Sequence, residues 1–363
     1  MDADRVEDRP SGLASFVPGH RVAVAAVVCL FAAYGFLFFY SDGQKLLTVA
    51  SNLSWLRLLL PVGGTLASYA LMALSYEGIA NAGATAIGFL PMLRITFVSN
   101  TVNYIVSTGG LSGFAVRMYF FRQSGIPMAR AVTISFVQGL LTNLALLGFL
   151  LMGFYFLLTD ETLGVTTLAS AAVLLAVFVI ATALGVFLLI HPHLRRRVFL
   201  WTVEAFHRLA RRFLPAHRRP RRARLWRLQR SIDHGLSFLL AKWQHMVLPA
   251  LYIALDWFLT IGVLWGCFWC VGERLPFPLA TIGFAVGVLT SMVSVVPGGI
   301  GIMEGSMTLV FVALGVDRES TVIAVLLFRL IYYGVPFLVS LAFFRGMLKV
   351  ARRQSDADLT QMP

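Results

Sequence analysis

Long apolar runs, separated by short polar segments, cover most of this chain. Most of the runs approach or exceed 20 residues, the length at which a helix crosses the hydrocarbon core of a bilayer. A short loop with glycines, at residues 77–85, separates the second run from the third. The pattern predicts an all-α polytopic membrane protein. The runs occupy residues 22–40, 55–76, 86–106, 131–158, 165–190, 246–271, 276–296, 303–314 and 321–344.

One apolar stretch is interrupted between Val296 and Gly305, where the sequence reads VPGGIGIMEG. Proline cannot donate a helical hydrogen bond, and glycine allows backbone shapes closed to other residues, so a helix should break here. At membrane depth such a break is tolerated only where protein or a watery cavity covers it. A broken segment followed by an ionisable group, here Glu304, is typical of a transporter site. A glycine hinge beside a glutamate that reaches the membrane surface is the simpler interpretation.

A second break has similar lettering. Residues 107–113 read STGGLSG, and Arg117 follows them as Glu304 follows the other break. Each Gly-Gly pair precedes a similar loop, GIP at 125–127 and GVD at 315–317, at separations of 15 and 16 residues. Paired interruptions in two halves of a chain point to the binding site of a secondary transporter.

Composition and charge exclude a soluble domain. Of the 363 residues, 58% are hydrophobic and 13% charged, with a formal charge of +13. Segment 191–245 alone holds 14 Lys or Arg against two acidic residues. Aromatic residues interleave with these arginines, which favours an interfacial amphipathic helix pair on anionic lipid headgroups rather than a nucleic-acid site. Because basic loops remain cytoplasmic, this loop and both termini are expected inside, in an inner membrane.

These loop sides are satisfied by six full spans plus two re-entrant broken hairpins, at 86–121 and 277–316, that enter from opposite faces as an inverted repeat. Ten short spans give the same loop sides, so 8–10 helical membrane segments are expected. The predicted organisation is a cytoplasmic tail (1–20), an N-terminal membrane half (21–190), a basic cytoplasmic loop (191–245), a C-terminal membrane half (246–345) and a second cytoplasmic tail (346–363).

The two breaks define the candidate substrate site. Glycines expose backbone N–H groups at helix starts, where an anion is stabilised, and arginine adds charge-assisted contacts to a phosphate. Glu304 suits a cation, a proton or Arg329 itself. The predicted binding residues are Gly109, Gly110, Gly113, Arg117, Pro297, Gly298, Gly299, Gly301, Glu304 and Arg329. The candidate lining residues are Asn100, Asn103, Gln138, Asn143 and Asp256, of which the two asparagines share one helical face and equally suit helix–helix contacts.

No catalytic constellation, metal-ligand set or cofactor motif is recognised. His191 and His193 flank a proline with no third ligand nearby. Cys267 and Cys270 have the spacing of a redox pair but lie in apolar sequence without a βαβ pattern, so they are interpreted as small apolar residues.

The stretch from Pro297 to Glu304, with the loop at Gly315 and Arg329 behind it, resembles the transmembrane domain of the lysylphosphatidylglycerol synthase/flippase family. The stretch from Gly109 to Arg117 is similar to that family's N-terminal counterpart, although it lacks a proline before its Gly-Gly pair. The resemblance covers about residues 20–345 and implies a stand-alone member that moves aminoacylated phospholipids between leaflets, without the synthetase domain. Stand-alone relatives include hopanoid-associated proteins, so the cargo remains open.

The sequence therefore predicts a lipid transporter or flippase. Two alternatives remain: a membrane-embedded transferase acting on a lipid carrier, and a non-transporting partner of a lipid-synthesis enzyme. The oligomeric state is not predicted.

Overall fold

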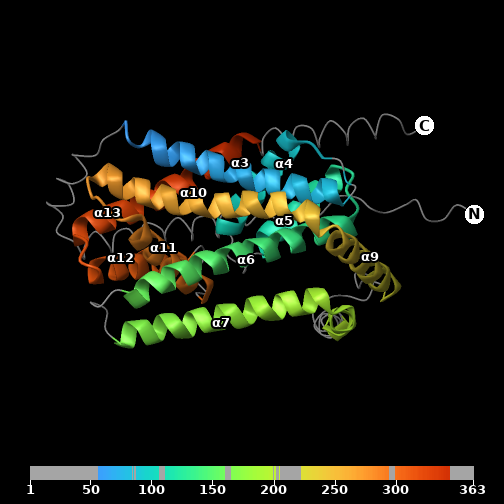
Figure 1. The fold of residues 1–363 in the computed structure, drawn as a ribbon. Helices are drawn as coiled ribbons and strands as arrows, with labels where there is room; N and C mark the ends of the chain where they lie inside the picture. Colours follow the sequence, from blue (N-terminus) through green and yellow to red (C-terminus); the bar gives the residue numbers. More distant parts are fainter. Residues whose placement is uncertain are drawn as a thin grey trace, which may run out of the picture.

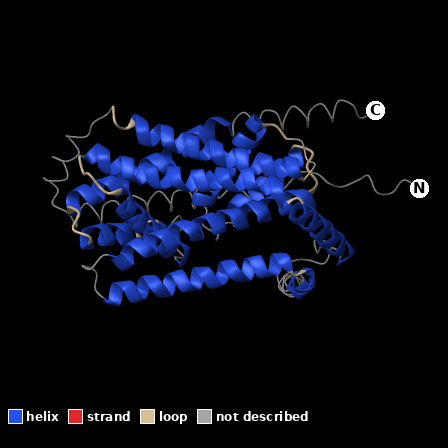
Figure 2. Ribbon diagram, in the orientation of Figure 1, coloured by secondary structure: helices blue, strands red, loops and turns tan. Residues whose placement is uncertain are grey.

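The described part of the chain is helical. The computed structural model describes residues 56–83, 85, 87–105, 111–159, 165–198, 200–201, 204, 222–293 and 299–343. These residues form helices and short loops without a strand, as Figure 2 shows. The predicted all-α fold is therefore confirmed for this part of the chain. The predicted first span, residues 22–40, lies outside it.

Within the part of the chain that the structure describes, four helices are long and apolar enough to cross a membrane. A fifth is α7 when it is counted with its continuation at 192–198, which bends away by 110°. Figure 1 shows these helices running roughly side by side, with α7 at the edge of the bundle next to α6. The helices are α3 (Leu59–Ala82), α6 (Met128–Thr159), α7 (Val165–Ile190), α10 (Val247–Val271) and α13 (Arg318–Arg329), the last continuing through the π-helical turn η4 (Leu330–Gly334) to Phe343.

Four shorter helices form two pairs, each joined through one of the glycine-containing breaks. The pairs are α4 (Phe89–Ile105) with α5 (Leu111–Gln123), and α11 (Phe277–Val293) with α12 (Ile302–Ala313). At a rise of about 1.5 Å per residue, each helix reaches roughly 18 to 26 Å, less than the thickness of the hydrocarbon core. Figure 1 places the first pair toward the end of the bundle that carries α9 and the second toward the opposite end.

Close contacts hold each pair together. In the second pair, a Cβ placed on Gly283 would lie 2.1 Å from the ring of Phe311, which is fully buried. In the first pair, a Cβ on Gly113 would lie 2.7 Å from both Asn103 Cβ and the carbonyl oxygen of Ser99. Small residues at such positions let two helix backbones approach closely.

The main core lies where α3 and α10 pack against α13 and the second pair. Tyr69, Phe268, Phe311 and Phe328 are among its fully or almost fully buried side chains. The predicted loop at 77–85 was wrong, because α3 continues to Ala82. Ile79 and Ala80 are fully buried there, so packing outweighs the loop-forming glycine and asparagine residues.

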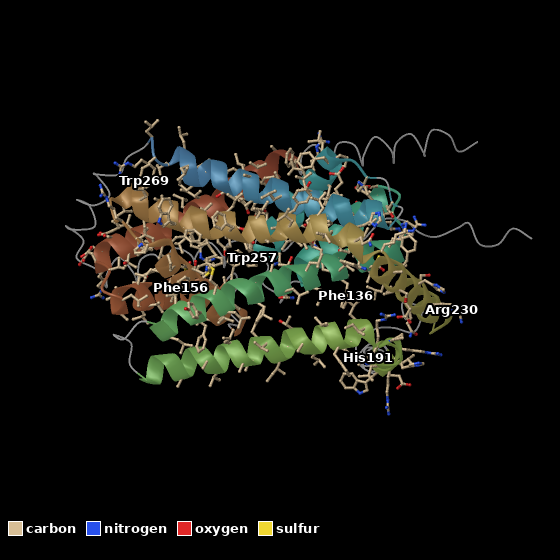
Figure 3. All side chains as sticks on the ribbon, viewed as in Figure 1. Phe136, Phe156, His191, Arg230, Trp257 and Trp269 are labelled. Atoms are coloured by element: carbon tan, nitrogen blue, oxygen red, sulfur yellow. The ribbon has the colours of Figure 1, made fainter. Side chains whose placement is uncertain are left out.

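The basic segment folds back onto one end of the bundle. Helix α9 (Arg222–Ala241) packs against α6, and Arg195, beyond the end of α7, forms a 2.6 Å ion pair with Asp233 of α9. Arg195 also donates to the carbonyl oxygen of Leu189 and so caps α7. Figure 3 shows His191 and Arg230 at this end and Trp269 at the other. The middle of the predicted helix pair lies outside the described residues.

Candidate functional site

The second break ends in two residues with left-handed backbone. Gly299 and Gly301 have φ values of 61° and 83°, which L side chains adopt only with strain. The chain can therefore turn sharply before α12 begins at Ile302. The backbone N–H of Gly301 donates to Glu304 Oε2 at 2.8 Å, which satisfies one of the free donors at the helix start. Pro297 and Gly298 lie outside the described residues.

Glu304 and Arg329 form a buried ion pair. Arg329 Nε lies 2.8 Å from Glu304 Oε1, and its Nη2 donates to Glu304 Oε2 at 3.3 Å. Nη2 also donates to the carbonyl oxygen of Gly299 at 3.3 Å, so the arginine binds both the break and the first turn of α12. The two residues are only 3% and 6% exposed. The predicted pairing is therefore present, and it neutralises both charges.

Two tyrosines connect this pair to the end of α4. The guanidinium of Arg329 lies over the ring of Tyr333, 4.5 Å from its centroid. The Tyr333 ring is in edge contact with Tyr104, whose centroid is also 4.5 Å away, one residue before α4 ends. Thr101 of α4 donates to the carbonyl oxygen of Pro336 at 3.4 Å. The α4 end that precedes the first break and the α12 start that follows the second thus converge on the same stretch of the last span.

Arg117 lies elsewhere, against α3 and α4. Its guanidinium sits over the ring of Tyr76 at 4.4 Å and donates to Ser99 Oγ at 3.4 Å and to Asn100 Oδ1 at 3.3 Å. Among the described residues no carboxylate pairs with it. The half-buried cation is thus held by neutral groups.

The structure places the predicted lining residues as follows, some in contacts between helices and some with an unpaired or buried polar group. Asn103 packs against Gly113, and its Oδ1 is buried without a hydrogen-bond partner among the described residues. Gln138 of α6 accepts a 2.7 Å hydrogen bond from Ser75 of α3, which is a helix–helix contact. Asn143 is half-buried in α6. Asp256 is buried in α10 and accepts a hydrogen bond from Ser68 of α3. Gly109 and Gly110 lie outside the described residues.

Sequence reasoning missed the aromatic members of this region. Tyr76 and Tyr333 contact the two arginines, and Tyr104 joins the end of α4 to Tyr333. Each of these tyrosines lies in an apolar run where a tyrosine carries no positional signal. The spacing of Arg329 and Tyr333, four residues apart, is the one clue the sequence offers, since such residues share a helix face.

Comparison with known proteins agrees with this architecture. The sequence profile of the lysylphosphatidylglycerol synthase TM region matches residues 21–340. The chain belongs to this family. It is 26% identical over 296 residues to a phosphatidylglycerol lysyltransferase of Staphylococcus xylosus, a match that covers 80% of this chain and 29% of that protein. A phosphatidylglycerol lysyltransferase of Staphylococcus aureus (strain COL) is 33% identical over 86 residues, which cover 24% of this chain and 10% of that protein.

The match covers only part of the length of these relatives. The chain spans less than a third of the length of the relatives it matches, and the matching part is the transmembrane region of the family. Together with the apolar helices of the fold, the family identifies a multi-pass membrane protein with a lipid-related role.

Proposed function

We propose that this protein is a lipid transporter that moves a phospholipid or aminoacyl-phospholipid between the two leaflets of a cell inner membrane. The main supporting observation is that the end of α4 and the start of α12, which flank the two breaks, converge beside a buried Glu304–Arg329 pair. A second arginine, Arg117 in the first pair, has no carboxylate partner among the described residues. Buried ionisable groups beside broken helices are expensive in a membrane and mark transport pathways.

The proposed membrane arrangement has six spans and two re-entrant hairpins related as an inverted repeat. Three observations support it: the four hairpin helices are short, each pair packs together across its break, and the pairs lie toward opposite ends of the bundle in Figure 1. Both termini and the basic segment would face the cytoplasm, because cytoplasmic loops collect Lys and Arg.

Arg117 is the proposed phosphate contact. Arg329 already has a carboxylate partner, so binding a second anion there would first require Glu304 to leave or to take up a proton. Arg117 is held by hydroxyl, amide and aromatic groups, and a lipid phosphate would supply the missing counter-charge. The glycines at 109, 110, 113, 298, 299 and 301 would add backbone N–H donors as the hairpins open.

The Glu304–Arg329 pair would act as a closing contact between the second hairpin and the last span. It bridges Gly299, the first turn of α12 and α13. A headgroup could enter the region between the hairpins only after these elements separate. A transporter that alternates between two faces needs such a contact to be formed in one state and broken in another.

The relatives suggest the class of cargo. Their name refers to phosphatidylglycerol and lysine transfer, and the matching part of them is the membrane region. Phosphatidylglycerol and its lysyl derivative are therefore the first cargoes to test. Anionic headgroups at the basic segment 191–245, in which Arg197 and Arg230 are exposed, are the proposed further lipid partners. Phosphatidylglycerol that copurifies with the protein should decrease when Arg197 and Arg230 are both replaced by glutamine.

The decisive experiment is a leaflet-exchange assay in proteoliposomes, with fluorescent phosphatidylglycerol and with lysyl-phosphatidylglycerol as probes. Arg117→Gln should slow exchange by roughly 10- to 100-fold, because it removes about 1.5–3 kcal/mol of charge-assisted binding. Arg94→Gln is the matched control: Arg94 lies on the same hairpin but is exposed, and it should exchange lipid as the parent does.

The same vesicles separate the alternatives. Exchange without a change in lipid mass supports transport. A new lipid species, detected by mass spectrometry after a lipid carrier is supplied, would instead show a membrane transferase. If neither exchange nor a new lipid is detected, the transport proposal is wrong, and a partner role in lipid synthesis takes its place.

A further inference from the structure

A second buried carboxylate lies apart from the Glu304–Arg329 pair. Asp256, in the middle of α10, is 5% exposed, and Ser68 Oγ of α3 donates a hydrogen bond to its Oδ1. Among the described residues no arginine, lysine or histidine forms an ion pair with it. A carboxylate buried in a membrane without a cation is costly to keep ionised. Asp256 must therefore bind a cation from outside or carry a proton.

The surroundings of Asp256 favour the proton. Ser68 Oγ lies 3.4 Å from Thr260 Oγ1 and 3.5 Å from the hydroxyl of Tyr332, and Thr260 Oγ1 lies 3.1 Å from that hydroxyl. The hydroxyls are thus in hydrogen-bond contact with one another. An ammonium group would have to push them apart, whereas a proton needs no additional volume.

The hydrogen bonds also leave the ionised form poorly solvated. A carboxylate can accept about four hydrogen bonds. Thr260 Oγ1 lies 2.9 Å from the backbone carbonyl oxygen of Asp256, so its hydroxyl is engaged there and with Tyr332. Ser68 is the one side chain, within the described residues, that donates to the carboxylate of Asp256.

The titratable groups that face Asp256 are tyrosines. Tyr69 comes from α3, Tyr104 from α4 and Tyr332 from η4, and each lies within electrostatic range of the carboxylate. Helix α11, which also packs on α10, contains no titratable residue between Phe277 and Val293. In α6 the two such residues, Arg130 and Tyr155, lie near the helix ends and are exposed. Two other elements that pack on α10 carry basic residues: His245 of η2 is exposed, and Arg329 of α13 is paired with Glu304. Among the described residues, none of these elements therefore supplies a positive charge that pairs with Asp256.

A continuous set of contacts links Asp256 to the candidate lipid site. Tyr332 contacts the Ser68 and Thr260 hydroxyls and its ring packs against that of Tyr333 at 5.6 Å, while Tyr333 lies beneath Arg329. Both tyrosines belong to η4, the π-helical turn directly after Arg329. π-helical turns inside α-helices are often found at functional sites. A shift of Tyr332 would move the turn that also positions Tyr333 against Arg329.

We propose that Asp256 is a proton-binding site, and that uptake and release of one proton there are coupled to lipid movement through η4. In uptake, a carboxylate oxygen forms one O–H bond with a proton from one aqueous side. In release, that bond breaks and the proton leaves to the other side, so no other reactant is needed. The coupling to lipid rests on the function proposed above; the proton site itself does not.

Infrared difference spectroscopy of the purified full-length protein, recorded while the pH is changed, tests the proton site without any lipid substrate. Between about pH 6 and pH 9 exposed carboxylates stay ionised. The carbonyl stretch of a protonated carboxylic acid should appear and disappear within this range, and Asp256→Asn should abolish that band. Ser68→Ala should shift its frequency, because the hydroxyl donor is lost. Asp317→Asn is the control: it makes the same chemical change at an exposed helix cap and should leave the band intact. An unchanged band in Asp256→Asn would overturn the assignment.

Coupling is tested in proteoliposomes with fluorescent phosphatidylglycerol and a transmembrane pH gradient. A tenfold proton gradient should shift the leaflet distribution of the probe by up to about tenfold, if one proton moves with each lipid. Asp256→Asn should give a distribution that ignores the gradient. If the wild-type protein exchanges lipid but its leaflet distribution also ignores the gradient, the proposal that proton binding is coupled to lipid movement is wrong. If wild type exchanges no lipid while the infrared band remains, the proposed function fails and the proton site stands.

Discussion

The Glu304–Arg329 pair offers the sharpest test of the energetics of the site. We consider Glu304→Gln, Arg329→Met and the double variant. Glutamine can still accept the hydrogen bond from the Gly301 N–H, as residues at this position of a helix start commonly do, so Glu304→Gln removes the charge and retains the cap. Methionine fills a similar volume to arginine without a charge. The three variants therefore isolate the charge pairing.

Removal of one partner of a buried ion pair leaves an uncompensated charge, which costs about 3–5 kcal/mol. In Glu304→Gln the guanidinium cannot lose its proton, although its contact with Tyr333 remains. We expect that variant to reach the upper part of the range. In Arg329→Met the remaining carboxyl can take up a proton and become neutral, so the loss should be smaller by about 1–2 kcal/mol. The double variant should recover about 2–3 kcal/mol relative to the sum of the single losses.

Reversible unfolding in mixed detergent micelles measures these differences. A loss of about 3–5 kcal/mol raises the unfolding equilibrium constant by roughly 100- to 4,000-fold. Equal losses for the two single variants would contradict the argument from protonation. Additive losses in the double variant would show that the two charges do not stabilise one another, and the closing role of the pair would lose its energetic basis.

Two further predictions concern packing and topology. Gly283→Ala should destabilise the protein by about 1–3 kcal/mol, because the added methyl meets the buried ring of Phe311. Gly262→Ala is the control: the space around this glycine is open, so the change should be neutral or slightly stabilising in the same unfolding assay. In a variant whose native cysteines are replaced, single cysteines at Gln123 and Asp317 should react with a membrane-impermeant reagent from opposite sides of the membrane; labelling of both from the cytoplasm would exclude hairpins that enter from opposite faces.

Much of the helical order could be predicted from the apolar runs, because a run of that length has few alternatives in a bilayer. The two breaks were predictable for a different reason: Gly-Gly pairs, preceded in the second break by a proline, conflict with a continuous helix within apolar sequence. The Glu304–Arg329 pairing was one of the options that the charges allowed. The boundary of α3 was missed because burial of Ile79 and Ala80 outweighs the local preference of their neighbours.

The contacts between helices depend on which face each helix turns toward its neighbours, and residue type alone does not determine that orientation. Asp256 was selected as a polar residue in a span, but its Ser68 partner lies 188 positions away and became visible only when α3 and α10 were packed. The four-residue spacing of Arg329 and Tyr333 predicts that they share a helix face, but the stretch LIYYG gives no recognisable signal for the π-helical turn that contains Tyr333.

The π-helical turn has a consequence for anyone who compares or edits this last span. Each helical residue advances the side-chain direction by about 100°, and a π turn accommodates roughly one residue more than an α turn. Residues before Leu330 and after Gly334 thus follow two angular phases within one continuous rod. A single-residue deletion at Leu330, which is 65% exposed, would keep the rod long enough for a bilayer. Because the π turn holds about one residue more than an α turn, this deletion would leave an ordinary α turn, and the residues after Gly334 would keep their present directions. The same deletion elsewhere in the span would turn everything downstream by about a quarter of a revolution. A helical wheel drawn at a constant angle per residue through the whole segment would therefore misplace the residues after Gly334 by about a quarter of a revolution.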